Sequence, residues 1–479
     1  MTPHLLESLR LWLPELILAV GAMAVMLCGA CLKRPRPALL AAWAAMALAA
    51  VALLAAPAAP AAPFFGLISL DPLSRVFRWL AWSTIALTSL LVACSDEVEP
   101  RWTGELLGLL LAVGVGLMAI AESVHLLMAV LSIELVSLSS YCLVAMARTA
   151  RASEAALKYL LFGALSSGIM LFGMSWLFGL TGQMAFPAIR ASLVGVGPPL
   201  TQACVLAVGL VLVGLAFKIS MVPFHMWTPD VYEGAPLPVT AMLSVGPKAA
   251  GLALLLRLAW ALGPVWVAAA PVLIALTIVT MTLGNVLAIA QTNVKRLLAY
   301  STIGQVGYLL IGFVINTPQG YGALVLYLIA YLFMNLGLFA GVVAVHRATR
   351  SESLEAFRGL AHRAPALAAA CAIFLLSLAG MPPLLGFFGK FLLFGSAIES
   401  HRVALAVVGA INSALALYYY VNVIRLMYLL APAPGAASLR PSWPARLAVG
   451  ACAAATVGWG LCPGGLLVWI GRLIAENPL

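Results

Sequence analysis

Residues 216–250 read AFKISMVPFHMWTPDVYEGAPLPVTAMLSVGPKAA. It places Lys218 near the end of one long apolar run and Lys248 inside the next, with Pro223 and His225 between them. Runs of about 20 apolar residues are long enough to cross a bilayer as helices. Because proline removes a backbone donor and clashes with the preceding turn, the first helix is expected to break near Pro223. The stretch therefore predicts two membrane helices that each carry an interior lysine.

The composition of the whole chain indicates that lipid surrounds much of it. Of the 479 residues, 64% are hydrophobic and only 9% are charged, whereas soluble domains carry about 25% charge. Continuous apolar runs, without the alternation of a β-barrel, predict helices that satisfy their own backbone hydrogen bonds. We therefore predict an all-α polytopic membrane protein with about 14 transmembrane helices. The expected spans are 11–31, 38–56, 73–94, 104–121, 123–148, 154–181, 201–222, 237–261, 265–290, 298–316, 320–346, 367–395, 402–430 and 445–471.

Basic residues in the loops predict the orientation in the membrane. The net charge is +10, and fourteen Lys and Arg residues follow odd-numbered spans while six lie in the opposite loops. Cytoplasmic loops carry the excess of positive charge, so we expect the odd loops inside and both termini outside a bacterial inner membrane. The charge therefore marks topology and does not indicate a nucleic-acid partner. Cys28 and Cys31 have metal-site spacing, but no second pair completes a zinc set, so no metal site is expected.

Two of the expected spans contain helix breakers. The seventh breaks at Pro223, and the twelfth contains Gly380-Met381-Pro382-Pro383. Broken helices in corresponding halves of a membrane protein point to a transport site. The simpler alternative is a structural kink, because proline is common in membrane helices.

Ionisable side chains inside the expected spans are the strongest functional signal. A charge at the centre of a membrane helix costs about 2.5–3.5 kcal/mol, so such groups must face one another, water or the protein interior. Those expected inside spans are Glu134, Lys158, Lys218, Lys248 and Lys390.

Buried lysines suit proton transfer because burial disfavours their charged form, while a nearby carboxylate favours it. Glu134 and Lys218 would form such a switch if the fifth and seventh spans touch. Lys248 and Lys390 could then act as further stations, and His225 could relay protons near neutral pH.

Two of these residues have structural alternatives. Lys158 could form an ordinary i,i+4 ion pair with Glu154. His225 could merely satisfy a backbone carbonyl freed by the break.

Several segments of the chain resemble the antiporter-like subunits of respiratory complex I, the NADH–quinone oxidoreductase, and specifically their N type. The longest is 216–250, and the resemblance extends from about residue 66 to 430. The other matching segments are 132–144 around Glu134, 153–168 around Lys158, 293–301, and 380–390 ending at Lys390.

The resemblance implies a fold and a function. The fold would hold two inverted five-helix repeats, dividing the chain into an N-terminal segment 1–100, repeats 101–262 and 263–431, and a last helix in 432–479. Proton translocation would fall to the residues matching Glu134, Lys158, Lys218, Lys248 and Lys390, with His225 as a relay. The expected partners are an M-type antiporter-like subunit and the small membrane subunits.

The same resemblance implies that NADH, FMN, iron–sulfur clusters and quinone are bound by partner subunits. This agrees with the absence from the sequence of a phosphate loop, a dinucleotide fingerprint or a cysteine set for iron–sulfur clusters. No cofactor is therefore expected in this chain, which would still serve the enzyme as its proton-translocating part.

Subtype and rival functions rest on fewer residues. Lys390 resembles the N and L types, and the chain ends too soon for the lateral helix of the L type. One departure is Gln305, at a position where the family often has histidine; glutamine can hydrogen bond but cannot titrate near pH 7. The rivals are a subunit of a multisubunit cation/proton antiporter, which would use the same lysines, and a structural subunit that only spaces its neighbours.

Overall fold

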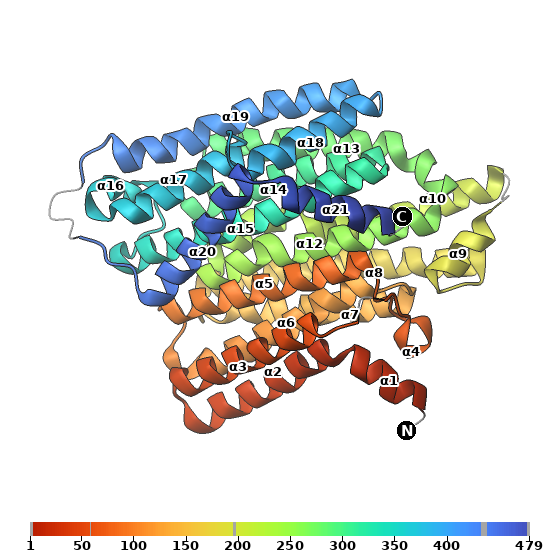
Figure 1. Cartoon of the computed structure of the whole chain (residues 1–479), viewed down its shortest axis with the longest axis horizontal. Helices are drawn as coiled ribbons and strands as arrows, with labels where there is room; N and C mark the ends of the chain where they lie inside the picture. Colours follow the sequence, from red (N-terminus) through yellow and green to blue (C-terminus); the bar gives the residue numbers. More distant parts are fainter. Residues whose placement is uncertain (1–2, 58, 195–197, 433–437, 477–479) are drawn as a thin grey trace.

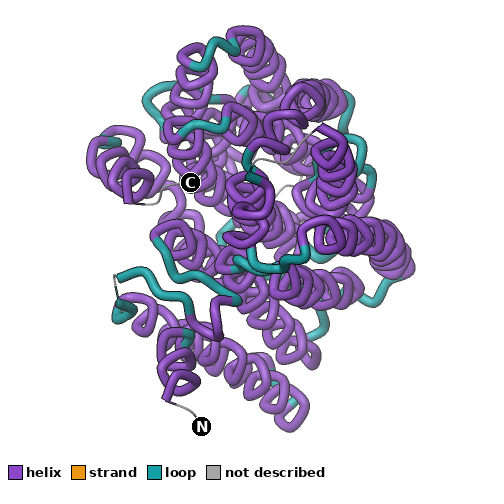
Figure 2. The backbone as a smooth tube through the Cα atoms, turned by 90° about the vertical axis from the view of Figure 1, so that its right-hand side faces the viewer, coloured by secondary structure: helices purple, strands orange, loops and turns teal. Residues whose placement is uncertain are grey.

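The computed structural model describes residues 3–57, 59–194, 198–432 and 438–476, and these form helices joined by short loops (Figure 1, Figure 2). Twelve described helices are long and apolar enough to cross a membrane, so the all-α polytopic fold is confirmed. They are α2 (Leu13–Leu32), α3 (Pro35–Leu54), α5 (Pro72–Cys94), α6 (Thr103–Glu122), α7 (Leu126–Ala145), α8 (Ala150–Thr181), α10 (Pro198–Ile219), α12 (Leu237–Leu262), α13 (Pro264–Ile289), α14 (Val294–Ile315), α15 (Pro318–Thr349) and α19 (Val403–Tyr428).

The remaining helices are short or paired across a break. The short ones are α1 (Pro3–Leu11), α4 (Pro63–Gly66), η1 (Pro100–Trp102), α9 (Phe186–Leu193), α11 (Trp227–Gly234), η2 (Leu354–Phe357) and α16 (Leu360–Arg363). The predicted twelfth span is divided into α17 (Pro365–Ala379) and α18 (Leu385–Glu399), as its proline pair suggested.

The predicted fourteenth span needs a correction, because 445–471 is not one continuous helix. It is divided into α20 (Trp443–Leu461) and α21 (Gly464–Glu476), which meet at a bend of 84°. Pro463 explains the bend, since it cannot donate a helical hydrogen bond and disfavours helical backbone at the residue before it. After the bend, α21 packs against α5 and α15.

The two broken spans end their first helices with the same backbone device. After α10, Ser220 N donates to Phe217 O at 3.1 Å and Met221 N donates to Ala216 O at 2.8 Å. After α17, Gly380 N donates to Ser377 O and Met381 N donates to Leu376 O, both at 3.0 Å. Both pairs form a Schellman motif, whose central residue has a left-handed conformation: φ is 63° at Ser220 and 90° at Gly380. The breaks are therefore built alike despite their different sequences.

The loops fall on two opposite faces, as alternating spans require. On the odd-loop face, which carries the loops after α2, α5, α7, α10, α13, α15 and α19, Lys295 pairs with Glu97 and Glu352. On the even-loop face, Leu126 N donates to Met184 O at 2.9 Å and Ser69 N donates to Glu122 O at 2.8 Å. These contacts join loops that are distant in sequence and so place those loops on a common face.

The core lies around α12, α14 and α15, which are buried almost along their whole length. In Figure 1 these helices occupy the middle of the molecule, with α2 and α3 at one edge and α19 at the other. Polar side chains in the middle of these three helices, such as Lys248, Gln305 and Asn335, are therefore buried within the protein.

Candidate functional site

Glu134 and Lys218 approach each other across α7 and α10. Lys218 is 4% exposed, and its Nζ donates to Ser137 Oγ at 2.5 Å, so the fifth and seventh predicted spans do meet. Glu134 is half-buried about one turn before Ser137, and its charge acts on Lys218. Among the described residues, Glu134 Oε1 has no hydrogen-bond partner. The carboxylate and the ammonium thus influence each other while Ser137 holds the ammonium.

Lys248 is enclosed at the centre of α12. Its side chain is fully buried, and its Nζ lies 4.6 Å from the ring centroid of Trp227 and 5.2 Å from that of Tyr232, both on α11. Aromatic faces attract a cation at such distances. No described residue hydrogen bonds to Nζ, while the charge of Lys218 acts on it. Lys248 is therefore a buried amine that faces two aromatic rings and has no hydrogen-bond partner among the described residues.

A neutral polar cluster on α14 continues from Lys248 toward the second break. Tyr232, beside Lys248, interacts with Tyr331, whose hydroxyl donates to Thr302 Oγ1 at 2.9 Å. One turn further along α14, Gln305 accepts a hydrogen bond from Tyr327 and its Nε2 lies 3.1 Å from the Tyr420 hydroxyl. All of these side chains are buried. The cluster connects the two lysine sites with groups that can donate and accept hydrogen bonds.

The second break supplies carbonyl groups to this cluster and to Lys390. Leu378 O and Ala379 O would accept helical bonds from residues 382 and 383, but both are proline and have no N–H. Gln305 Nε2 donates to Leu378 O at 3.1 Å instead. Ala379 O accepts from Lys390 Nζ at 3.2 Å and from Ser413 Oγ at 2.8 Å.

Lys390 is held by neutral groups only, within the described residues. It is 3% exposed, and its Nζ also donates to Ser413 Oγ at 3.0 Å and lies 4.1 Å from the ring centroid of Tyr308. No described carboxylate pairs with it. The structure therefore brings Glu134, Lys218, Lys248 and Lys390 into one buried polar row, which we call the central row, completed by Gln305 and its tyrosines.

Lys158 and His225 lie differently from the other predicted site residues. The Lys158 side chain is 40% exposed and pairs with Glu154 at 2.8 Å and Asp230 at 3.0 Å, so it stands outside the central row. We expected Lys158 to lie among the interior charges, and its exposed position shows that it does not. His225 lies in the loop between α10 and α11, and its Nδ1 is buried without a hydrogen-bond partner among the described residues.

Sequence reasoning missed an ionic network on the odd-loop face. It joins loops from both halves of the chain. The junction cluster consists of Glu97, Arg151, Lys158, Asp230, Glu233, Lys295, Arg296 and Glu352. The signal available in the sequence was the concentration of both signs of charge in the odd loops, which we had used only for orientation.

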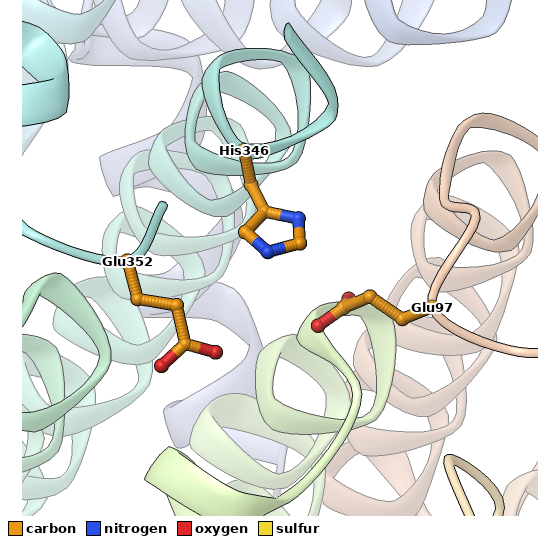
Figure 3. A group of neighbouring side chains, drawn as sticks. All are labelled: Glu97, His346 and Glu352. Carbon is orange, nitrogen blue, oxygen red and sulfur yellow. The ribbon is translucent and has the colours of Figure 1, made fainter. Parts of the chain in front are cut away.

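Two carboxylates of the junction cluster, together with the neighbouring His346, have the donor set of a cation site. Carboxylate and imidazole atoms of Glu97, His346 and Glu352 lie within 4.8 Å of one another and converge in Figure 3. Lys295 Nζ, however, lies 2.6 Å from Glu352 and 3.5 Å from Glu97. The lysine ammonium already provides the positive charge that these carboxylates require.

Ion pairs control the acidity of two carboxyl groups in the junction cluster. Burial favours the neutral form of Asp230, but Lys158 and Arg296 outweigh it and hold the pKa of Asp230 below its ordinary value. Burial likewise opposes ionisation of Glu352, and Lys295 outweighs it, so the pKa of Glu352 is also lowered. Both groups are therefore charged at neutral pH.

A second set of buried charges lies toward the even-loop face. Arg78 contacts Glu15 at 2.7 Å and Glu122 at 3.0 Å, tying α2 and α6 to α5. Arg257 of α12 pairs with Asp71, the residue before α5, at 2.7 Å. These pairs satisfy charges that the sequence left unexplained, and they fasten the N-terminal helices to the core.

Comparison with known proteins gives consistent relatives. Residues 123–416 match the family model described as NADH:quinone oxidoreductase/Mrp antiporter, TM. NADH-quinone oxidoreductase subunit N 2 of Sorangium cellulosum is 46% identical over 76% of each chain. NADH-quinone oxidoreductase subunit N of Anaeromyxobacter sp. is 42% identical over 93% of this chain and 92% of its own.

Solved structures share the fold. A chain of respiratory complex I from Thermus thermophilus with bound aureothin is 35% identical, with a TM-score of 0.81 over 95% of this chain and 98% of that one. A chain of the Mrp complex from Dietzia sp. has a TM-score of 0.88 over 100% of this chain and 98% of that one, but only 22% identity, which shows the fold alone.

Proposed function

The chain belongs to the NADH-quinone oxidoreductase subunit N family, and we propose that it moves protons across the membrane as part of an NADH–quinone oxidoreductase. The observation that carries the proposal is the central row. Four ionisable side chains lie inside a bundle of membrane helices, joined by buried hydroxyl and amide groups. Buried charges of this kind are costly in a membrane and mark proton pathways.

The route that we propose runs from Lys218 to Lys248 and on through Gln305 to Lys390. A carboxylate such as Glu134 attracts a nearby ammonium such as Lys218, whereas two ammonium groups such as Lys218 and Lys248 repel each other. A change in charge near Glu134 would therefore shift the proton from one lysine to the next. Gln305 cannot titrate, so it would orient hydroxyl groups and leave the transfer itself to them.

The assembly around the chain follows from the family. It is a multi-pass inner-membrane protein that works with the other membrane-arm subunits, among which we propose an M-type neighbour and the small membrane subunits. We further propose that NADH, FMN, iron–sulfur clusters and quinone bind to partner subunits. In this arrangement the odd-loop face is cytoplasmic, both termini are periplasmic, and protons move outward.

Lys158 and His225 have secondary roles in this proposal. Lys158 would not hold a transferred proton in the central row. It would instead pair with Asp230, which also pairs with Arg296. His225 would relay protons between the odd-loop face and Lys218, using the ring nitrogen that no described residue occupies.

The rival function is cation/proton exchange by a multisubunit antiporter. The Mrp structure supports a shared fold, whereas the relatives at 40–46% identity are subunits of NADH–quinone or NAD(P)H–quinone oxidoreductases. The oxidoreductase is therefore the better-supported assignment.

The test is proton pumping by the reconstituted complex with Lys248→Ala. We expect the number of protons moved per NADH oxidised to fall, together with at least a tenfold loss of pumping rate. Arg425→Ala is the matched control, because Arg425 is an exposed cation on α19 whose guanidinium donates to Asn422 Oδ1 on the same helix. Unchanged stoichiometry in Lys248→Ala would refute the route, and sodium-driven proton flux without redox subunits would favour the antiporter.

A further inference from the structure

A large apolar groove opens between α17 and α20, away from the central row. Its volume is about 1070 Å³. Small side chains create the space, because the sides of α17 and α20 that face each other carry mainly alanine and glycine. The residues that form its walls include Ala366, Ala369 and Ala370 of α17, and Val449, Gly450 and Ala453 of α20.

One end of the groove is strongly basic. Arg363, Arg440 and Arg446 line this end, and Leu439 N donates to Arg363 O at 3.1 Å, which holds the two arginine-bearing segments together. Arg440 and Arg446 are exposed and form no ion pair with any residue that the structure describes. Both α17 and α20 also begin at this end, so the positive ends of two helix dipoles add to the field.

The position of the groove in the membrane fits one class of ligand. The arginines lie on the odd-loop face, and the apolar walls run from there along the membrane-crossing helices. Acyl chains would meet only alanine, glycine and other apolar surface, while a phosphate at the mouth would meet arginine. Basic pockets between membrane helices at the cytoplasmic surface are suited to anionic lipid head groups.

We propose that this groove binds an anionic phospholipid, with its acyl chains between α17 and α20 and its phosphate at Arg440 and Arg446. The lipid would pack against α17, whose far end carries Leu378 O and Ala379 O, the carbonyls that meet Gln305 and Lys390. The proposal stands apart from the proton route, since a lipid site would exist whether or not the lysines transfer protons.

The test uses the assembled complex in bilayers containing phosphatidylglycerol or phosphatidylcholine with a photoreactive acyl chain. Label is mapped by mass spectrometry to peptides covering 365–373 and 445–453. We expect phosphatidylglycerol to label these peptides at least about fivefold more than phosphatidylcholine, which is the effect of one basic residue near an anionic lipid. Arg440→Ala with Arg446→Ala should remove that preference. Lys33→Ala with Arg34→Ala, two exposed cations on the same face, should preserve it.

A second variant tests the groove independently of charge. Gly450→Leu places a side chain where an added Cβ meets nothing within 4 Å, so it should fill the groove without disturbing α20 and reduce labelling by both lipids. Gly458→Leu on the same helix also meets open space, but Gly458 does not line the groove, so labelling should persist. Equal labelling by the two lipids, no effect of Gly450→Leu, or crosslinks to a partner subunit at these peptides would overturn the proposal.

Discussion

The break after α10 and the break after α17 share a backbone design but place their lysines on opposite sides of it. Lys218 lies in the last turn of the first helix and donates to a side chain on α7. Lys390 lies in the helix after the break and donates back to Ala379 O, a carbonyl that the proline pair leaves without a helical partner. The two breaks therefore serve their lysines differently. Lys218 precedes the first break and bonds to a neighbouring helix, whereas the second break supplies the carbonyl that Lys390 binds.

The surroundings of the two lysines differ in charge. Lys218 feels the carboxylate of Glu134, whereas the described partners of Lys390 are a carbonyl, a hydroxyl and an aromatic face. A carboxylate stabilises an ammonium and makes it sensitive to any change in their separation. Neutral dipoles stabilise an ammonium less than a carboxylate does, so its protonation depends less on small changes in their separation. On the proposed proton route, we therefore expect the protonation of Lys218 to be switched by its surroundings and Lys390 to release its proton.

The largest effect that this comparison predicts is for Glu134→Gln. The substitution keeps the size of the side chain and removes the negative charge that acts on Lys218. We expect at least a tenfold fall in proton pumping by the reconstituted complex, measured with a pH-sensitive dye and normalised to NADH oxidation. Glu355→Gln changes an exposed carboxylate in the short helix η2; it is the control and should pump normally. Normal coupling in Glu134→Gln would show that the two halves do not differ in the way proposed.

A smaller effect is expected at the central residues of the two Schellman motifs. Gly380→Ala forces a side chain into a backbone with φ of 90° and brings the new Cβ within 2.9 Å of Lys390 Cδ. A non-glycine residue in the left-handed region costs about 1–2 kcal/mol. Ser220→Gly should instead change the stability little. The left-handed backbone at φ of 63° is less strained with glycine, and this gain offsets the lost hydrogen bond from the Thr228 hydroxyl.

Thermal inactivation of the purified complex and the fraction of chain assembled measure both variants. Gly395→Ala in α18 is the control, since an added Cβ there meets nothing within 4 Å. If Gly380→Ala is as stable as the parent, or Ser220→Gly is the more damaging of the two, the two motifs are not equivalent.

The sequence was sufficient for those features that depend on local chemistry. Apolar runs located the helices, prolines located both breaks, and the cost of buried charge singled out Glu134, Lys218, Lys248 and Lys390. It could not show which carbonyls the prolines would leave for Gln305 and Lys390, because that depends on how α14 and α18 pack against the break. The exposed position of Lys158 was also hidden, since an interior lysine and one paired with Asp230 read alike along a helix.

The bend at Pro463 shows the same limit from another side. Proline predicted breaks at Pro223 and Pro382. Pro463 is itself followed by Gly464 and Gly465, but residues 445–471 were apolar enough to read as one span. Pro463 permits the bend, and the packing of α21 against α5 and α15 sets the direction in which the chain turns. Hydropathy indicates whether a segment lies in lipid or in water, but it does not show whether the helix within that segment bends.

The smallest predicted effect concerns α11, the short helix that follows only the first break. Its outer side carries Asp230, paired with Lys158 and Arg296, and its inner side carries Trp227 and Tyr232 against Lys248. Because the pKa of Asp230 lies below its ordinary value, its ion pairs stabilise the fold above the unfolded pKa. That contribution is lost only as the pH falls through the still lower folded pKa. Asp230→Asn should therefore cost no more than about 1 kcal/mol, as exposed ion pairs do.

The measurement is thermal inactivation of the complex as a function of pH. The difference between parent and Asp230→Asn should be constant from pH 6 to 8 and should shrink only below about pH 4, near the ordinary pKa of an aspartate. Glu154→Gln removes the other carboxylate of Lys158 and is the matched control, because Glu154 is on α8 and leaves α11 clamped by Arg296. A difference that already shrinks between pH 8 and 6 would contradict the lowered pKa, since it would require a group that titrates near neutrality. A large loss of pumping in Asp230→Asn without loss of stability would instead place Asp230 in the proton route, and the first half would then differ from the second by one more carboxylate.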